Sequence, residues 1–114
     1  MSATEVEIAE RYRELALEWA SLRDYPKKAN ILFKKHHAYF KEIRGLPQGQ
    51  RALRSLLDDA EVPVRLLAAT HSLSFAATEA EGVLRQLERG EDVYAMDAKY
   101  TLISYRAGNL DLDW

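Results

Sequence analysis

The sequence predicts an all-α protein, and three observations lead to that fold class. The 114 residues contain only three prolines and five glycines, and two long stretches, residues 2–25 and 27–44, contain neither. Residues of high helix propensity, such as Ala, Leu, Glu, Lys and Arg, dominate both stretches. Apolar residues recur at steps of three and four, the period of a helix with one buried face. A chain of this length is expected to form one domain, here residues 1–114.

Composition excludes several classes of protein. The chain has no cysteine, which excludes disulfides, cysteine-ligated metals and thiol catalysis. With 47% hydrophobic and 30% charged residues it has the composition of a globular protein rather than a disordered one. No apolar run approaches the ~20 residues of a membrane helix, and the start of the chain lacks the pattern of a signal peptide. We therefore expect a soluble cytoplasmic protein with no cofactor, no bound metal and no membrane partner.

The first predicted helix covers residues 4–23. Thr4 and Glu7 have the spacing of a capping box, in which the hydroxyl and the carboxylate each bond to a backbone N–H that the helix leaves over. Ser2 and Glu5 offer the same pattern two residues earlier. A single apolar stripe then predicts one buried face, and it consists of Ile8, Tyr12, Leu15, Trp19 and Leu22.

A second helix is predicted over residues 26–44 and a short third helix over residues 50–57. Pro26 suits a first helical turn, because the N–H that it lacks has no partner there, and Asp24 is the expected cap. Gly45 ends the helix. The expected apolar face of the second helix consists of Ala29, Leu32, Phe33, His36, Tyr39, Phe40 and Ile43.

Three further helices complete the prediction. The first of them is apolar nearly all round, which predicts a central helix packed on two sides. Thr78 and Glu81 form another capping-box pair, and Gly108 is the stop signal of the last helix. Leu110 is expected to fold back on that helix, and Trp114 to dock either on the domain or on a partner. The three helices cover residues 62–75, 78–89 and 92–106.

Short connections between six helices predict three antiparallel helical pairs. Stacked pairs would form a short α-solenoid, in which each pair contacts only its neighbours. A closed helical bundle is the alternative arrangement, and the spacing of the helices along the chain agrees with both.

Residues 53–87 resemble a HEAT-type repeat. In such repeats an acidic turn is followed by Val-Arg and then by a helix rich in small residues. The matching residues here are Asp58-Asp59, Val64-Arg65 and Ala68-Ala69. The resemblance implies that Arg65 bonds back to the turn at Asp59, since the guanidinium group needs an acceptor. Both residues are therefore expected to have a structural role.

The whole chain resembles an uncharacterised bacterial family of single HEAT-like domains, a domain of unknown function. Tyr105 stands where that family often has tryptophan. The resemblance implies an all-helical, right-handed stack with an adaptor-like or immunity-type binding role, and it implies no catalytic residues. The matching segments are Lys27-Lys28-Ala29-Asn30, residues 53–59, Val64-Arg65, Ala68-Ala69-Thr70-His71, Ala98, Thr101-Leu102 and Gly108-Asn109-Leu110.

The three histidines are expected to serve as core or surface residues rather than as metal ligands. His36 lies on the apolar face of the second helix and His71 on that of the fourth, so both are expected to be structural core residues. His37 lies about 100° around the helix from His36, on an expected outer face with Lys34 and Lys41. A metal site formed by His36 and His71 is the alternative, but no Glu-x-x-His motif supports it.

Charge is divided unevenly along the chain, although the formal net charge is only −2. Residues 1–22 carry five acids against two bases, residues 23–54 nine bases against two acids, and residues 55–114 eleven acids against five bases. The net charges of these segments are therefore −3, +7 and −6. A one-sided basic strip is typical of surfaces that bind nucleic acid or an acidic protein. The alternative is that acidic neighbours neutralise the basic helices within the molecule.

These observations predict a non-enzymatic protein-interaction module, with an immunity or regulatory protein as the expected type. Two acidic clusters, Asp58-Asp59-Glu61 and Glu91-Asp92, lie in turns at helix starts, where capping and the helix dipole account for them without catalysis. The expected partner is a protein with an acidic surface. Nucleic acid is the alternative partner, but the aromatic residues near the basic ones fall on the expected buried stripe, where they cannot stack on bases. The predicted partner-binding residues are Lys34, Lys35, His37, Lys41, Arg44 and Arg54.

Overall fold

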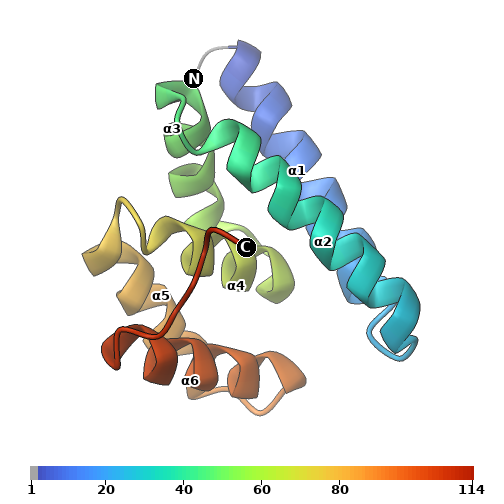
Figure 1. Cartoon of the computed structure of the whole chain (residues 1–114), viewed down its shortest axis with the longest axis vertical. Helices are drawn as coiled ribbons and strands as arrows, with labels where there is room; N and C mark the ends of the chain where they lie inside the picture. The colour runs from blue at the N-terminus through green and yellow to red at the C-terminus, as the bar shows by residue number, and fades with distance from the viewer. Residues whose placement is uncertain (1–2) are drawn as a thin grey trace. The chain divides into compact units, whose positions relative to one another are not determined.

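The computed structural model describes residues 3–114, and it is all-helical over that range (Figure 1). The predicted fold class is therefore confirmed as all-α. None of the helices in the described range has both the length and the apolar character needed to cross a membrane. The elements are α1 (Ala3–Ser21), α2 (Pro26–Ile43), α3 (Pro47–Ser55), the short 3₁₀ helix η1 (Leu56–Asp58), α4 (Val62–Ser72), α5 (Ala77–Glu88) and α6 (Val93–Arg106).

The chain divides into two compact units, residues 1–56 and residues 57–114. Unit 1 contains α1, α2 and α3, and unit 2 contains α4, α5 and α6, so the helices group as two sets of three. Each unit buries apolar residues of its own. The single domain over residues 1–114 and the solenoid arrangement both stay predictions.

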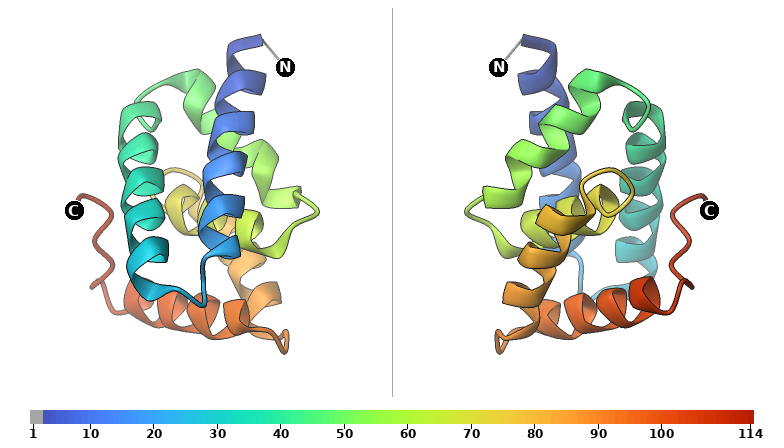
Figure 2. Two further views of the ribbon diagram at one scale, coloured as in Figure 1. Left: turned by 90° about the vertical axis from the view of Figure 1, so that its right-hand side faces the viewer. Right: turned by 90° about the vertical axis from the view of Figure 1, so that its left-hand side faces the viewer.

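Unit 1 is built on α1, which packs against both α2 and α3. Figure 2 shows α1 and α2 side by side and antiparallel, joined by the turn at residues 22–25. The predicted stripe of α1 is buried up to Trp19, and Leu22 at its end is half-buried. Trp19 meets Phe33 of α2 with ring centroids 5.9 Å apart. The core residues of the unit are Ile8, Tyr12, Leu15, Ala16, Trp19, Ala29, Phe40, Ile43, Ala52, Leu53 and Leu56.

Gly49 allows the start of α3 to approach the end of α2. A Cβ atom at residue 49 would lie 1.9 Å from the carbonyl oxygen of Ile43 and 2.8 Å from its carbonyl carbon. Real Cβ atoms do not approach backbone atoms so closely. The turn between α2 and α3 therefore requires glycine at this position.

Several helices begin at residues other than the predicted caps. Thr4 and Thr78 lie inside α1 and α5, so neither is a cap, and the pattern that begins at Ser2 lies outside the described residues. The N-cap of α2 is Tyr25 rather than Asp24, because Pro26 already occupies the first turn. At the start of α6, Asp92 is a true cap, whose side chain accepts hydrogen bonds from the N–H groups of residues 94 and 95.

Unit 2 packs its helices through small residues. α5 packs against both α4 and α6, and α4 also contacts α6. Side chains as small as alanine let helix backbones approach closely while still removing apolar surface from water. The predicted central character of α4 agrees with its burial, since eight of its eleven residues are buried. The buried alanines of the unit are Ala68, Ala69, Ala76, Ala80, Ala95 and Ala98.

The turn before α4 is closed by Arg65, which bonds back to Asp59 as the resemblance implied, through the backbone of Asp59. The guanidinium of Arg65 donates to the backbone carbonyl of Asp59 at 2.7 Å and to that of Ala60 at 3.2 Å. The carboxylate of Asp59 instead accepts from the backbone N–H of Glu61 at 2.9 Å. Arg65 therefore does bond back to the acidic turn, but carbonyl oxygens are its acceptors.

The last helix ends where the sequence predicted. Gly108 has a φ of 73°, a left-handed conformation that glycine adopts without strain. The N–H groups of Gly108 and Asn109 donate to the carbonyls of Tyr105 and Ser104 at 3.0 and 2.8 Å, which completes a Schellman motif. The following tail, seen in red in Figure 1, lines a cavity of about 240 Å³ with Leu73, Ser74, Tyr105, Leu110, Leu112 and Asp113. Trp114 beyond it is half exposed.

Candidate interaction surface

α2 presents its lysines to solvent in two rows. Lys27, Lys34 and Lys41 follow one another at seven-residue spacing, and Lys28 and Lys35 form a second row. Seven residues are nearly two turns of a helix, so each row runs along one side of it. All five side chains lie at least partly in solvent. We call these five lysines the basic face of α2.

An apolar strip separates the two rows of the basic face. Ile31 and Ala38 lie between the rows on the helix, and both are exposed, Ile31 to 56%. Glu42 continues the second row by seven residues and places one carboxylate beside the lysines. The surface is therefore basic at its edges, apolar along its middle and interrupted by one acid.

The arginines predicted to join this surface are placed differently from one another. Arg54 of α3 is exposed. Arg44 is half-buried, and its guanidinium lies 5.6 Å from the ring centroid of Phe40. Arg51, which was not among the predicted residues, donates from Nε to the buried carboxylate of Glu5 on α1. That ion pair satisfies a charge that would be costly to bury alone, and it ties α3 to α1.

His37 is buried, so its predicted place on the outer face is wrong. Its side chain is only 3% exposed, and its ring packs against Phe40 with centroids 5.7 Å apart. On a helix, residue 37 lies about 60° from residue 40 and about 40° from Lys41. The buried face of α2 is wide enough to include it, and His37 leaves the set of residues that can contact a partner directly.

His36 has the core position that the sequence predicted. It is 1% exposed, and its ring meets that of Tyr12 on α1 at a centroid distance of 4.1 Å and an interplanar angle of 60°. Burial, and after it the neighbouring His37, lowers the pKa of His36 from 6.5 to about 3, whereas a hydrogen bond with the backbone of Tyr12 opposes this change. The imidazole is therefore neutral at physiological pH.

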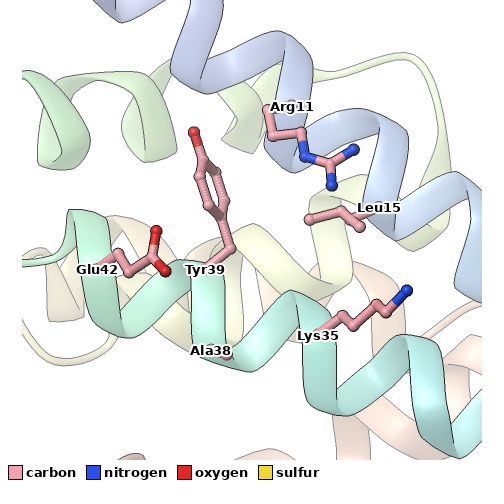
Figure 3. Close-up of a pocket in the computed structure, with 6 residues that line it drawn as sticks. All are labelled: Arg11, Leu15, Lys35, Ala38, Tyr39 and Glu42. Atoms are coloured by element: carbon pink, nitrogen blue, oxygen red, sulfur yellow. The ribbon is translucent and has the colours of Figure 1, made fainter.

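A groove of about 420 Å³ lies between α1 and α2 (Figure 3). Tyr39 stands between the two helices, with Lys35 and Glu42 on its own helix and Arg11 across from it on α1. Burial raises the pKa of the Tyr39 hydroxyl; Arg11 opposes this change, and Glu42 and Glu7 add to it. The groove borders one row of the basic face and contains both signs of charge.

Unit 1 separates its charges onto two neighbouring helices. Its residues include eleven bases and seven acids, a net charge of +4, whereas unit 2 has a net charge of −6. α1 exposes Glu7, Glu10, Glu14 and Glu18 at least in part, and the carboxylate of Glu14 lies 3.8 Å from the guanidinium of Arg11. The acidic helix α1 therefore lies beside the basic helix α2. This agrees in part with the alternative in which acidic neighbours neutralise the basic helices within the molecule, but the five lysines are still exposed to solvent.

Metal-ligating side chains do not gather in the described part of the chain. Within residues 3–114 no group of three or more His, Asp or Glu side chains is placed to hold a metal ion. His36 belongs to unit 1 and His71 to unit 2, and both are buried.

Two features of the structure were not predicted from the sequence. The ion pair of Glu5 and Arg51 joins residues 46 positions apart, and no local sequence pattern predicts it. The second feature is a row of large apolar side chains on the outside of α6. The spacing of Val93, Met96, Tyr100 and Ile103 was the available signal for it.

Comparisons of the chain with protein-family models, with curated proteins and with solved structures found no match.

Proposed function

We propose that this protein is a non-enzymatic protein-interaction module that binds an acidic helical segment of a partner through the basic face of α2. The observation that carries the proposal is the pattern of exposure on α2. Five solvent-accessible lysines border a strip formed by Ile31 and Ala38. A partner helix with an apolar stripe between acidic edges would complement this surface in both respects.

The pattern favours a protein partner over nucleic acid. A surface for a phosphate backbone gains from continuous positive charge, but Glu42 interrupts one row of lysines. Single-stranded nucleic acid also needs exposed aromatic rings on which bases stack. Phe40 is buried, and Phe33 and Tyr39 are half-buried. The exposed ring beside the basic face is that of Tyr25 at the N-cap of α2, and the Nζ atom of Lys28 lies over it, so α2 offers no row of rings for successive bases. The exposed Ile31 suits a protein surface instead.

The proposal includes the HEAT-like character of the chain and an immunity or regulatory role. Helical-repeat proteins bind partners through extended helix surfaces, which agrees with a binding surface that follows one helix. The bonds from Arg65 to the turn at residues 59 and 60 are consistent with a HEAT-type turn.

A binding experiment with defined probes tests the proposal. The first probe is a labelled amphipathic peptide of about 21 residues with leucines along one face and glutamates at both edges, long enough to form helix. The second is a peptide of the same composition in scrambled order, and the third is a DNA duplex of about 20 base pairs. Fluorescence anisotropy at about 150 mM salt, where surface charges are screened beyond ~8 Å, measures each dissociation constant.

We expect the ordered peptide to bind more tightly than the scrambled peptide. Replacing both Lys34 and Lys41 by Glu should weaken binding by at least ~10-fold, because it reverses two charges opposite the acidic edge. Arg85→Glu, a charge reversal at an exposed position of α5, is the control and should change affinity by less than ~2-fold. Equal binding of the two peptides, or preference for the DNA duplex, would overturn the proposal.

A further inference from the structure

The outer side of α6 exposes four large apolar residues in one row. Val93, Met96, Tyr100 and Ile103 are each between 51% and 60% exposed. Their spacing of three, four and three places them on one face of the helix. The opposite face is buried through Ala95, Ala98 and Leu102 within unit 2. We call the four exposed residues the α6 stripe.

The α6 stripe has the pattern of a coiled-coil contact. Single exposed apolar residues are ordinary, but a continuous exposed row along a whole helix marks an interaction surface. The alternating steps of three and four are those of the a and d positions of two heptads. The stripe is therefore shaped to receive a helix along its length.

The charges at the two ends of α6 favour a partner helix that runs antiparallel to it. α6 is preceded by Glu91 and Asp92 and ends at Arg106, so its start is acidic and its end is basic. The helix dipole is positive at the start and negative at the end. A second copy of α6 that runs antiparallel brings Arg106 of each copy to Asp92 of the other. A parallel copy would instead bring the acidic starts of both copies together.

The antiparallel register also matches the side chains of the stripe. With Asp92 opposite Arg106, Met96 of one copy lies beside Tyr100 of the other, and Val93 beside Ile103. Contacts between a thioether and an aromatic ring are favourable. Lys99 of the two copies lies near the two-fold axis, which opposes pairing, but its exposure keeps that repulsion small.

We propose that the α6 stripe is the contact surface of a symmetric antiparallel dimer of this protein. The dimer is weak. The largest apolar patch on a typical monomer covers ~300–600 Å², so two such patches bury a total near or below ~1,200 Å². Stable complexes bury more than that, so the dissociation constant is expected in the micromolar range or above. The dimer surface lies in unit 2, and it does not depend on the proposed binding surface of α2.

Sedimentation equilibrium of the full chain tests the dimer. Between about 10 µM and about 1 mM protein, a range that brackets micromolar affinity, the average mass should rise from 13.1 kDa toward twice that value. Met96→Glu and Tyr100→Glu should each raise the dissociation constant at least ~10-fold, because each buries a charge in the contact. Ile31→Glu is the matched control, an exposed apolar residue of α2, and should leave dimerisation unchanged.

The register has its own test. Arg106→Asp places two acids together at each end of the dimer and should weaken it. Asp92→Asn combined with Arg106→Asp removes that repulsion and should restore part of the affinity, while Asn keeps an oxygen that can cap α6. Helical circular dichroism of each variant confirms that it folds.

Three results would overturn the proposed dimer. The first is a monomer at every concentration. The second is that Ile31→Glu weakens dimerisation as much as Met96→Glu does. The third is that the variant with both Asp92→Asn and Arg106→Asp dimerises no more tightly than Arg106→Asp alone. If the α6 stripe binds the ordered acidic peptide instead of a second copy, the protein stays monomeric at every concentration. Tyr100→Glu then loses peptide binding. Loss of peptide binding in Ile31→Glu is the result expected for the proposed function, because Ile31 lies between the two rows of the basic face of α2. It does not test the dimer.

Discussion

At the scale of single residues, two adjacent histidines show how burial sets chemistry in unit 1. His36 packs on Tyr12 and His37 packs on Phe40, so both rings lie among aromatic side chains. Desolvation penalises the charged form of an imidazole, and a second positive charge beside it would be costly as well. The low pKa of His36 makes the folded chain sensitive to acid.

Acid should destabilise the protein through His36. Its pKa is about 3 in the folded chain, against an ordinary value of 6.5. Above pH 6.5 the ring is neutral in both states, and this residue gives no pH dependence. Between these two values only the unfolded state binds the proton, so the free energy of unfolding falls as the pH falls, by up to about 1.4 kcal/mol per unit. Urea unfolding from about pH 7.5 to about pH 4.5 measures this slope.

His36→Gln provides the comparison for the acid effect. Glutamine does not titrate, so the pH dependence of the free energy of unfolding should be smaller in the variant by the contribution of up to one proton. At neutral pH the variant should be less stable than the natural chain, because the packing on Tyr12 changes. A slope unchanged by the substitution would assign the acid sensitivity to other groups.

At the scale of elements, turns and helix ends decide how the helices meet. Gly108 ends α6 through a left-handed conformation, and Gly49 admits the backbone of Ile43. The turn before α4 is held by Arg65 through carbonyl oxygens rather than a carboxylate. In each case backbone atoms make the contact. The sequence marked Gly108 as a helix end and implied the bond from Arg65 to the turn, whereas no side-chain pattern indicated the close approach of Gly49 to Ile43.

Two glycine substitutions should have opposite effects on stability. Gly49→Ala should lower the free energy of unfolding by about 1–3 kcal/mol or more, because the new Cβ overlaps the Ile43 carbonyl. Gly82→Ala is the control. It lies within α5, and a Cβ atom there would have no neighbour within 4 Å, so the substitution should raise stability by about 0.5–1 kcal/mol. Chemical denaturation of both variants measures the two changes, and a neutral Gly49→Ala would contradict the close approach.

At the scale of the whole molecule, the chain is two units of three helices with opposite net charge. Unit 1 contains 56 residues and unit 2 contains 58. A domain near 60 residues buries only about 60% of the surface that its unfolded chain exposes, so each unit alone would be marginal. The prediction of one domain over residues 1–114 therefore implies that the units stabilise each other.

That implication can be tested by following each unit as the chain unfolds. Trp19 lies in unit 1 and Trp114 in unit 2, so a Trp114→Phe variant gives tryptophan fluorescence from unit 1 alone. Circular dichroism follows the helices of both units. For a single domain we expect the two signals to have coincident midpoints in urea. Midpoints that differ would show two independent domains and contradict the prediction.

Sequence by itself determined the elements of this protein. Periodicity identified each of the six helices, Pro26 and Gly108 marked helix ends, and the count of charges located the basic segment in α2 and α3. These features depend on neighbouring residues within a few turns, so they can be read from a single chain. The solvent accessibility of Lys34, Lys35, Lys41 and Arg54 also follows, because charged side chains are rarely buried without a partner.

Only the tertiary structure decided which faces are covered. It buried His37, paired Glu5 with Arg51, assigned α3 to the unit of α1, and left the α6 stripe exposed. The physical reason is that a helix pattern defines a face but not what packs against it. Burial of that face depends on contacts between residues far apart in the chain, and no local spacing specifies them.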